Sequence, residues 1–347
     1  MKIISSFKQG FTLTRRTKRM IFFAWFVNVM LAMVIALPTM KQLDGYLRGT
    51  VMDEKILERT DAAWVGAFRA DMEKSEYIRG LDWTIYEYAP FLNHLEMQMN
   101  GTFVRTLGTF LYDLIFRWEL TLGPTSLLFF LSLLYVCVNA FLAGGFIGIY
   151  AKDYPSTFTE FLMDGARYFG KFFRLALVAL IVYYLFYVFL VDGINSFIQS
   201  TTQTEASEVL PYRYYMIRNV VVLLFLSLLA MMFDYARVRM VVDDRTSSLG
   251  AFVAGTRFAF SNFRNTYGLY LLLTLVGFLL IILYAVTESL IPQSSYWPLF
   301  LLFVVQQAYV LLRLWLKAAY YAGQTRLYQG IVTHQHAASV SPPPPSV

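Results

Sequence analysis

Six apolar stretches, each about 20 residues long, constrain the fold of this 347-residue chain more than any other feature. A helix of that length crosses the hydrocarbon core of a bilayer. Charged residues make up only 15% of the chain and its mean hydropathy is +0.51, which excludes an ordinary soluble domain. The sequence therefore predicts an all-α integral membrane protein. Its six transmembrane helices are predicted over 20–37, 126–149, 175–191, 216–233, 266–285 and 297–316.

The first apolar stretch follows several Lys and Arg residues, as the apolar core of a secretory signal peptide does. It is longer than the usual core of such a peptide, and no small-residue cleavage motif precedes Pro38. We therefore interpret the stretch as a retained membrane anchor.

The charges of the connecting segments predict the orientation of the spans. One side of the membrane would hold the N-terminal segment 1–19, the segments 152–174 and 234–265, and the tail 317–347. Together with the adjoining span ends, this side carries 18 basic and 6 acidic residues, against 11 and 17 on the other side. Cytoplasmic segments carry an excess of Lys and Arg. Both termini of this multi-pass protein are therefore predicted to be cytoplasmic, with segment 38–124 outside.

The external segment 38–124 is the only sizeable soluble part, and its pattern is helical. Residues 52–76 are rich in helix-forming side chains, and apolar side chains recur at helical spacing over 103–122. Residues 80–91 interleave aromatic and acidic side chains. They either cap a small helical domain or form its contact surface for a ligand or a partner. The proline-rich end of the cytoplasmic tail, 339–347, is predicted to be disordered.

An internal repeat appears when the chain is shifted by 90 residues. The shift aligns five identical pairs: Asp153 with Asp243, Gly165 with Gly255, Arg167 with Arg257, Phe173 with Phe263, and Arg174 with Arg264. Each copy is predicted to be a helix, a cytoplasmic amphipathic helix and a second helix, so the two copies form parallel repeats. The amphipathic helices, in 152–174 and 234–265, should place Phe side chains on the bundle or at the acyl boundary. Arg167 and Arg257 would then face the lipid headgroups.

Polar side chains inside the predicted spans are costly there, and they form the first candidate site. They are Asn28, Asn139, Gln306 and Gln307. Hydrogen bonding between helices is the structural interpretation, and a polar path or small-molecule site is the functional alternative.

A charged cluster near the cytoplasmic ends of the fourth and sixth spans is the second candidate site. Its members are Asp234, Arg237, Arg239, Asp243, Arg313 and Lys317. Acids and bases at this depth should pair and clamp the helices together, and binding of anionic lipid headgroups is the alternative. We expect Asp234 to pair with Arg237, Arg313 or Lys317.

Motifs of catalysis and metal binding are missing from the sequence. It has no Gly-rich phosphate loop, no H-E-x-x-H and no C-x-x-C, and it has only three His and one Cys. We therefore predict no cofactor, no metal and no enzymatic activity. The net charge of +6 indicates membrane orientation and attraction to anionic lipids, not nucleic-acid binding.

Several short segments resemble a group of uncharacterised bacterial multi-span membrane proteins. They are FLAGG at 141–145, DYARVR at 234–239, DDRTSSLGA at 243–251, WLK at 315–317 and QTRL at 324–327. Asp243 stands where that group usually has Glu. The repeated unit is also distantly similar to the membrane domain beside some glycerophosphodiester phosphodiesterases, but no catalytic domain of that kind is present in this sequence. The resemblance implies a six-helix fold in a bacterial inner membrane. It does not indicate any particular activity.

Functions from different classes fit these features. The first is a non-enzymatic scaffold or accessory subunit that binds a protein or lipid partner. The second is a transporter or channel for a small or lipid-like molecule, and the third is a membrane enzyme that uses carboxylates of the external segment. A continuous polar cavity lined by Asn28, Asn139 and Gln306 would favour transport. A dry, tightly packed bundle would favour the scaffold.

Overall fold

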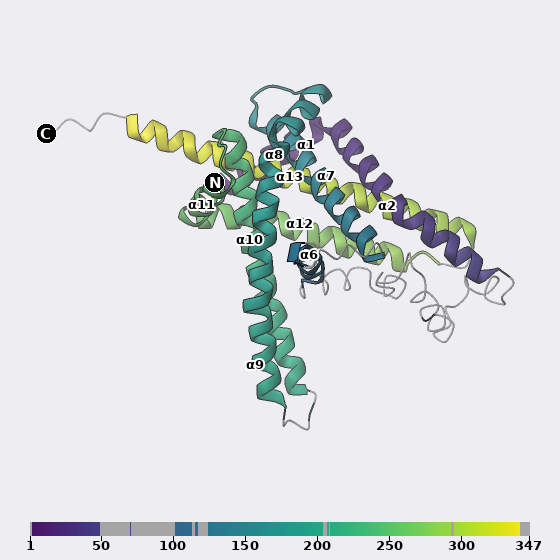
Figure 1. Ribbon diagram of the computed structural model, residues 1–347. Coiled ribbons are helices and arrows are strands. Elements are labelled where there is room, and N and C mark those ends of the chain that lie inside the picture. Colours follow the sequence, from purple (N-terminus) through teal and green to yellow (C-terminus); the bar gives the residue numbers. More distant parts are fainter. Residues whose placement is uncertain are drawn as a thin grey trace. The chain divides into compact units, whose positions relative to one another are not determined.

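The computed structural model describes residues 2–48, 70, 101–112, 115–116, 124–203, 207, 209–292 and 295–340. The regular structure of these residues is entirely helical (Figure 1). The elements are α1 (Lys2–Arg16), α2 (Lys18–Leu47), α6 (Thr102–Tyr112), α7 (Pro124–Ala151), α8 (Phe158–Leu185), the π-helix η3 (Phe186–Val191), α9 (Asp192–Thr202), α10 (Val209–Val242), α11 (Ser248–Ser261), α12 (Phe263–Ser289) and α13 (Tyr296–Val340).

Five helical segments among the described residues are long and apolar enough to cross a membrane. They are 130–151, 158–202, 209–242, 263–289 and 296–333. The helices 3–16 and 18–34 meet at 75° and make a sixth if the bent pair is one span. The six predicted stretches lie in α2, α7, α8 with η3, α10, α12 and α13. The prediction of an all-helical fold with several helices long and apolar enough to span a membrane is therefore confirmed for the described residues.

The first predicted amphipathic helix, 152–174, is not a separate helix. α8 continues without a break from Phe158 to Leu185 and joins these residues to the third span. In the second copy the chain does break, at Asn262 between α11 and α12. The 90-residue shift places Phe172 where Asn262 stands. Phe172 packs in the core at 2% exposure, whereas an Asn side chain competes for backbone hydrogen bonds and favours helix ends.

The predicted tail, 317–347, is also different in the structure. α13 continues helically from the sixth predicted span to Val340, so the tail is an extension of that span as far as the structure describes it. The extension is buried from Leu316 to Ile331 at most positions. Residues 339 and 340, which were predicted to be disordered, belong to α13, and 341–347 lie outside the described residues.

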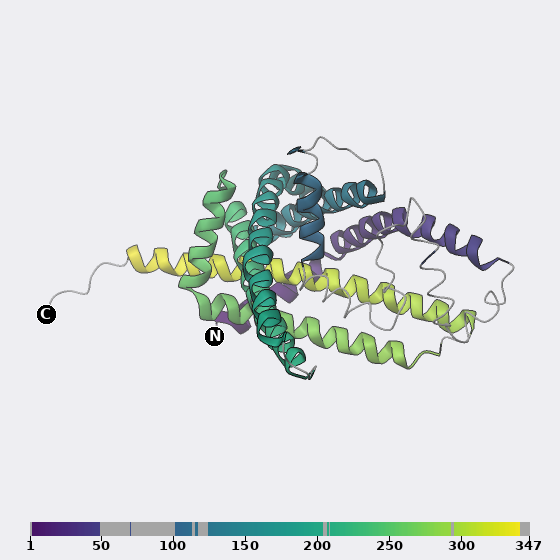
Figure 2. The same cartoon turned by 60° about the horizontal axis from the view of Figure 1, so that its bottom comes forward.

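The chain divides into two compact units. Unit 1 comprises 1–29, 137–175 and 230–347. Its buried side chains are concentrated in parts of its helices. In α7, nearly every residue from Ala140 to Tyr150 is buried. α1 and α12 both pack on α13, and Figure 2 shows α12 and α13 side by side. Many of the other large apolar side chains of these helices lie on the surface, as lipid-facing side chains do.

Glycines allow the helices of unit 1 to approach until their backbones touch. α1 crosses α13 so closely that a Cβ atom on Gly10 would lie 2.9 Å from the nitrogen of Gly323. α11 packs on α10 in the same manner, because a Cβ atom on Gly255 would lie 2.6 Å from the nitrogen of Ala236. Small residues at such contacts are typical of helix packing in membranes.

Unit 2 comprises 30–136 and 176–229. Here α6 lies near η3 and α9. Arg105 of α6 binds the Asp192 carboxylate of α9 through both terminal nitrogens, at 2.9 and 2.7 Å. Tyr187, Val191 and Val222 form the buried apolar cluster of this unit. Most of the predicted external domain, including 52–69, 71–76 and 80–91, lies outside the described residues, so its predicted contact surface is neither supported nor contradicted.

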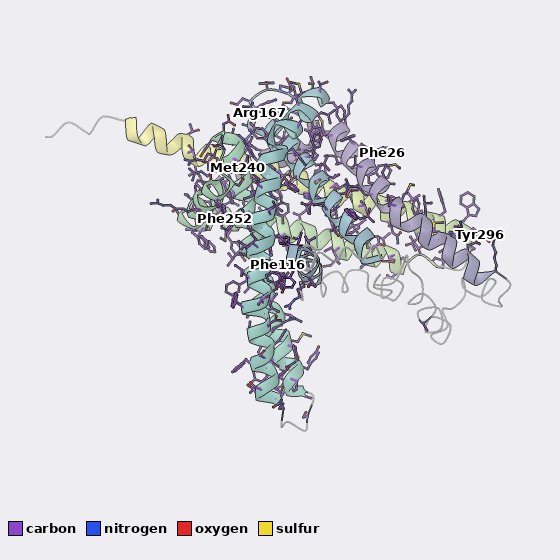
Figure 3. The ribbon with its side chains drawn as sticks, in the orientation of Figure 1. Phe26, Phe116, Arg167, Met240, Phe252 and Tyr296 are labelled. Carbon is purple, nitrogen blue, oxygen red and sulfur yellow. The ribbon has the colours of Figure 1, made fainter. Side chains whose placement is uncertain are left out.

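The surface of unit 1 carries large apolar side chains. Phe26 and Tyr296 are examples, and Tyr296, at 83% exposure, points away from the ribbon (Figure 3). Trp297 follows it at the start of α13 and is 80% exposed. Tyr and Trp are enriched where membrane helices meet the headgroups, so this end of α13 is suited to an interfacial position.

Candidate functional site

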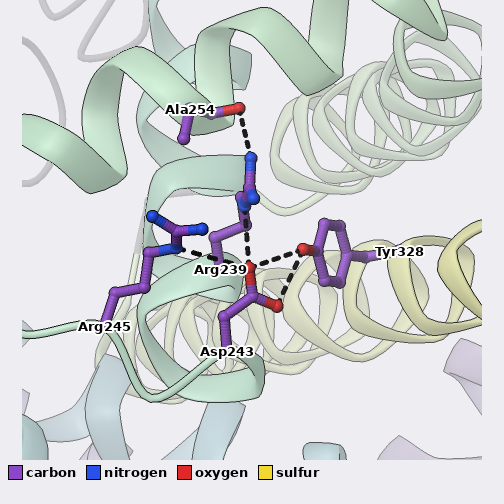
Figure 4. A network of polar contacts seen from close by, with 5 residues as sticks. All are labelled: Arg239, Asp243, Arg245, Ala254 and Tyr328. Carbon is purple, nitrogen blue, oxygen red and sulfur yellow. Dashed lines mark hydrogen bonds and ion pairs between the residues drawn. The ribbon is translucent and has the colours of Figure 1, made fainter.

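A polar network in unit 1 joins the ends of α7 and α10 to the extension of α13, and it contains most of the predicted charged cluster. Asp243 is one centre of this network (Figure 4). The Tyr328 hydroxyl donates to both carboxylate oxygens, at 2.8 and 3.0 Å. Arg239 Nε donates to the same carboxylate at 2.9 Å, and Arg245 lies 3.6 Å away. Arg239 also donates to the carbonyl of Ala254, so this centre connects α10, α11 and α13.

Asp234 is the second centre of the polar network. It forms an ion pair with Arg237, which lies on the same helix, at 2.9 Å. The link to α13 is made by Gln324, whose amide donates to Asp234 at 3.1 Å. The predicted pairing with Arg237 is therefore present, but Arg313 and Lys317 do not join α10 to α13. The reason is depth: Gln324 lies about two turns further along α13 than Lys317.

The turn after α7 also binds α13. Arg326 forms an ion pair with Asp153 at 2.7 Å and donates to the carbonyl of Lys152 at 2.9 Å. Gln329 donates to the carbonyl of Ala151 at 2.8 Å. These side chains satisfy carbonyls that the end of a helix leaves without intrahelical partners. Asp153 and Asp243, which the 90-residue shift aligns, thus both contact α13.

The turn between α10 and α11 binds α8 through Asp244. Its carboxylate accepts a hydrogen bond from Lys171 at 2.8 Å and one from Arg167 at 3.3 Å. The Lys171 hydrogen bond lowers the pKa of Asp244, with the positive charges of Lys171 and Arg167 acting in the same direction. Asp244 has a φ of 45°, in the left-handed region that Asp tolerates just after a helix. Arg167 was predicted to face lipid headgroups, and the structure pairs it with Asp244 while leaving it exposed.

The predicted intramembrane polar residues do not form one site. Gln307 accepts a hydrogen bond from Trp25 at 3.2 Å, and Gln306 lies near Tyr284. Asn28 donates to the carbonyl of Ala24 on its own helix at 2.7 Å. Asn139 accepts a hydrogen bond from Lys317 at 2.7 Å, a contact between the two predicted sites that the sequence did not indicate.

A small hollow lies beside this Asn139–Lys317 contact. Asn28, Asn139, Lys317 and Tyr321 supply its polar side chains, and the rest of its wall is apolar. Its volume is about 20 Å³, which accommodates about one water molecule. Gln306 and Gln307 do not line it.

Acidic and basic side chains of unit 1 differ in how many of them have partners. Six acidic side chains in 137–175 and 230–244 have partners: Asp153, Glu160, Asp164, Asp234, Asp243 and Asp244. Several exposed bases form no ion pair or side-chain hydrogen bond with the residues that the structure describes. These bases are Lys8, Arg15, Arg16, Lys18, Arg19, Arg257 and Arg264. We call the last six of them the free basic surface. The predicted headgroup residue Arg257 belongs to it.

Comparison with protein-family models, with curated proteins and with solved structures returns no match for this chain. The fold therefore defines the class of the protein: its described residues are helical and contain five or six helices long and apolar enough to span a membrane. The described residues contain no group of three or more side chains suited to holding a metal ion.

Proposed function

We propose that this protein is a non-enzymatic scaffold or accessory subunit of a bacterial inner membrane, and that the free basic surface binds anionic lipid headgroups. Its six spans would run with both termini in the cytoplasm. The proposal is supported by the difference between acidic and basic side chains in unit 1, because most acids have partners and several exposed bases have none among the described residues. Five carboxylates there form ion pairs with bases of the same unit, whereas the bases of the free basic surface remain exposed.

Exposed bases near an anionic leaflet attract it with about 1 kcal/mol each. Four of the six lie where α1 meets α2: Arg15, Arg16, Lys18 and Arg19. The other two, Arg257 and Arg264, lie on α11 and near the start of α12. Anionic headgroups would complete the charge balance that the described acids leave incomplete.

The surface of α11 supports a position at the lipid interface. Its buried face is made of small residues, with Ala251, Gly255 and Ala259 packed inside unit 1. Leu249, Val253 and Phe260 are exposed. A helix with exposed apolar side chains and a neighbouring Arg binds at the interface, with apolar groups among acyl chains and Arg at phosphates. A protein partner covering the same face is the alternative.

Transport is supported less well. The hollow beside Lys317 holds about one water molecule, and Gln306 does not line it. Asn28, Asn139 and Gln306 therefore do not line one continuous cavity in the described residues. This arrangement favours the scaffold over a channel or transporter.

The test compares lipids retained by two matched double variants. Full-length protein would be extracted in mild detergent from membranes containing phosphatidylglycerol and phosphatidylethanolamine, and bound lipids would be identified by mass spectrometry. Wild-type protein should be enriched in phosphatidylglycerol, and R257Q/R264Q should lose severalfold of that enrichment. The control K41Q/R213Q removes two exposed bases of unit 2 and should leave the enrichment unchanged. Equal loss in both variants, or no enrichment in wild type, would contradict lipid binding, and proteins in the same eluate would report a protein partner instead.

A further inference from the structure

The Lys317 ammonium is the feature of unit 1 that the polar network leaves unused. An ammonium has three N–H donors, and one of them is directed to Asn139 Oδ1 at 2.7 Å. Among the described residues, Lys317 forms no ion pair with a carboxylate, in contrast to Lys152 and Lys171. The Lys317 side chain is exposed, and two donors of its charged group have no partner among the described residues next to the hollow.

The charges around Lys317 favour an anion. Arg237 and Arg313 act on it electrostatically from nearby, and Asp234 is the carboxylate whose field reaches it. Asp234 is already bound by Arg237 at 2.9 Å and by Gln324 at 3.1 Å. Arg237 and Lys317 therefore share one carboxylate whose oxygens are already engaged, and Arg313 adds a further positive charge near Lys317. An anion at the hollow would meet a local excess of positive charge, whereas a cation would be repelled.

Lys317 follows directly after the sixth predicted span, near the depth of lipid phosphates, and its side chain reaches Asn139 inside the second predicted span. From Tyr296, at the exposed aromatic start of α13, to Lys317 an α-helix rises roughly 32 Å. The hydrocarbon core of a bilayer is roughly 30 Å thick. A helix that begins at one headgroup layer therefore brings Lys317 to the other, where phosphate groups lie.

We infer that the hollow between Asn28, Asn139 and Lys317 binds one oxygen of a phosphate group, with the Lys317 ammonium as its charged donor. The volume of about 20 Å³ admits one oxygen atom, while the rest of the group would remain outside the hollow. A phospholipid headgroup and free phosphate share this chemistry. The site deepens the proposed lipid-binding function and rests on it, because it adds a discrete position to the free basic surface.

The test measures anion binding to delipidated full-length protein in neutral detergent, through the ligand-dependent melting temperature. The probes are dihexanoyl phosphatidylglycerol, dihexanoyl phosphatidylcholine and sodium phosphate. Lys317→Gln should weaken the binding of phosphatidylglycerol on the order of tenfold or more, because a hydrogen bond to a charged group is lost. Lys317→Arg should retain most of the affinity. The control Lys8→Gln removes an exposed base outside the hollow and should bind as the wild type does.

A second variant keeps the inference testable if Lys317→Gln does not fold. Asn28→Asp is nearly isosteric and places a carboxylate in the wall of the hollow, so it should weaken anion binding at least as much. Binding of phosphatidylglycerol without free phosphate assigns the site to lipid, and equal binding of both assigns it to phosphate. Unchanged affinity in Lys317→Gln and Asn28→Asp would overturn the Lys317 site alone. The proposed function fails separately, if wild-type protein extracted from mixed membranes shows no phosphatidylglycerol enrichment.

Discussion

Gly255→Val is expected to destabilise unit 1 by about 3 kcal/mol, near the upper end of the usual range for an overpacked interior. The new Cβ atom would lie 2.6 Å from the nitrogen and 2.7 Å from the Cα atom of Ala236. These are backbone atoms, so α10 and α11 must move apart as whole helices. That movement would also lengthen the 2.8 Å hydrogen bond from Arg239 to the carbonyl of Ala254. Thermal unfolding of the purified protein in detergent should show a melting temperature lower by several degrees.

Gly170→Ala is the matched control for this prediction. Gly170 lies inside α8, and a Cβ atom there would have no other atom within 4 Å. Alanine favours an exposed helix interior over glycine by about 0.5–1 kcal/mol, so this variant should be as stable as wild type or slightly more stable. If the Gly255→Val and Gly170→Ala proteins have the same melting temperature, α10 and α11 are not in backbone contact.

Asp234→Ala is expected to cost about 2–3 kcal/mol of unfolding free energy. The carboxylate is 16% exposed and Arg237 is 29% exposed, so both are largely removed from water. Removing the acid leaves Arg237 without this ion pair and leaves the buried amide of Gln324 without its acceptor. Losing one member of a buried pair costs more than the pair itself contributes, because the remaining group stays desolvated.

Double-mutant cycles in detergent identify the true partners of Asp234. Asp234→Ala combined with Gln324→Ala should be less damaging than the sum of the single changes by about 1 kcal/mol or more. Asp234→Ala combined with Arg313→Ala should be additive within about 0.5 kcal/mol. A coupling to Arg313 that equals or exceeds the coupling to Gln324 would contradict the contacts of the polar network.

The apolar stretches predicted the helices well because burial in lipid leaves the chain few alternatives. A backbone without water must satisfy its hydrogen bonds internally, so an apolar run of sufficient length becomes a helix. The boundary between α8 and the preceding amphipathic residues was predicted less well. Periodicity alone does not show whether one helix continues into the next. Phe172 allows α8 to continue, whereas Asn262, whose side chain favours helix ends, stands at the break between α11 and α12.

The polar network was predicted only in part. Asp234, Arg237, Arg239 and Asp243 could be proposed from their place at the end of a span. Their partners Gln324 and Tyr328 could not, because pairing between distant helices depends on tertiary packing. A signal was present in the sequence: after Lys317 the chain continues without proline to Val340, and Gln324 and Tyr328 share a helical face at a spacing of four. That pattern indicates a buried extension of the sixth span rather than a free tail.

Cysteine accessibility decides whether the free basic surface lies on the cytoplasmic side of a membrane-spanning bundle. On a Cys137→Ser background, Thr246→Cys would report the turn between α10 and α11, and Leu290→Cys would report the end of α12. Both positions are exposed, so a reagent can reach them. The nearby Ser248 is a poorer labelling position, because it is buried and donates a hydrogen bond to the carbonyl of Lys171. In intact cells a membrane-impermeant maleimide should label the cysteine at 290 and should reach the one at 246 only after the inner membrane is permeabilised. Labelling of the cysteine at 246 in intact cells would place the basic surface outside and contradict the account.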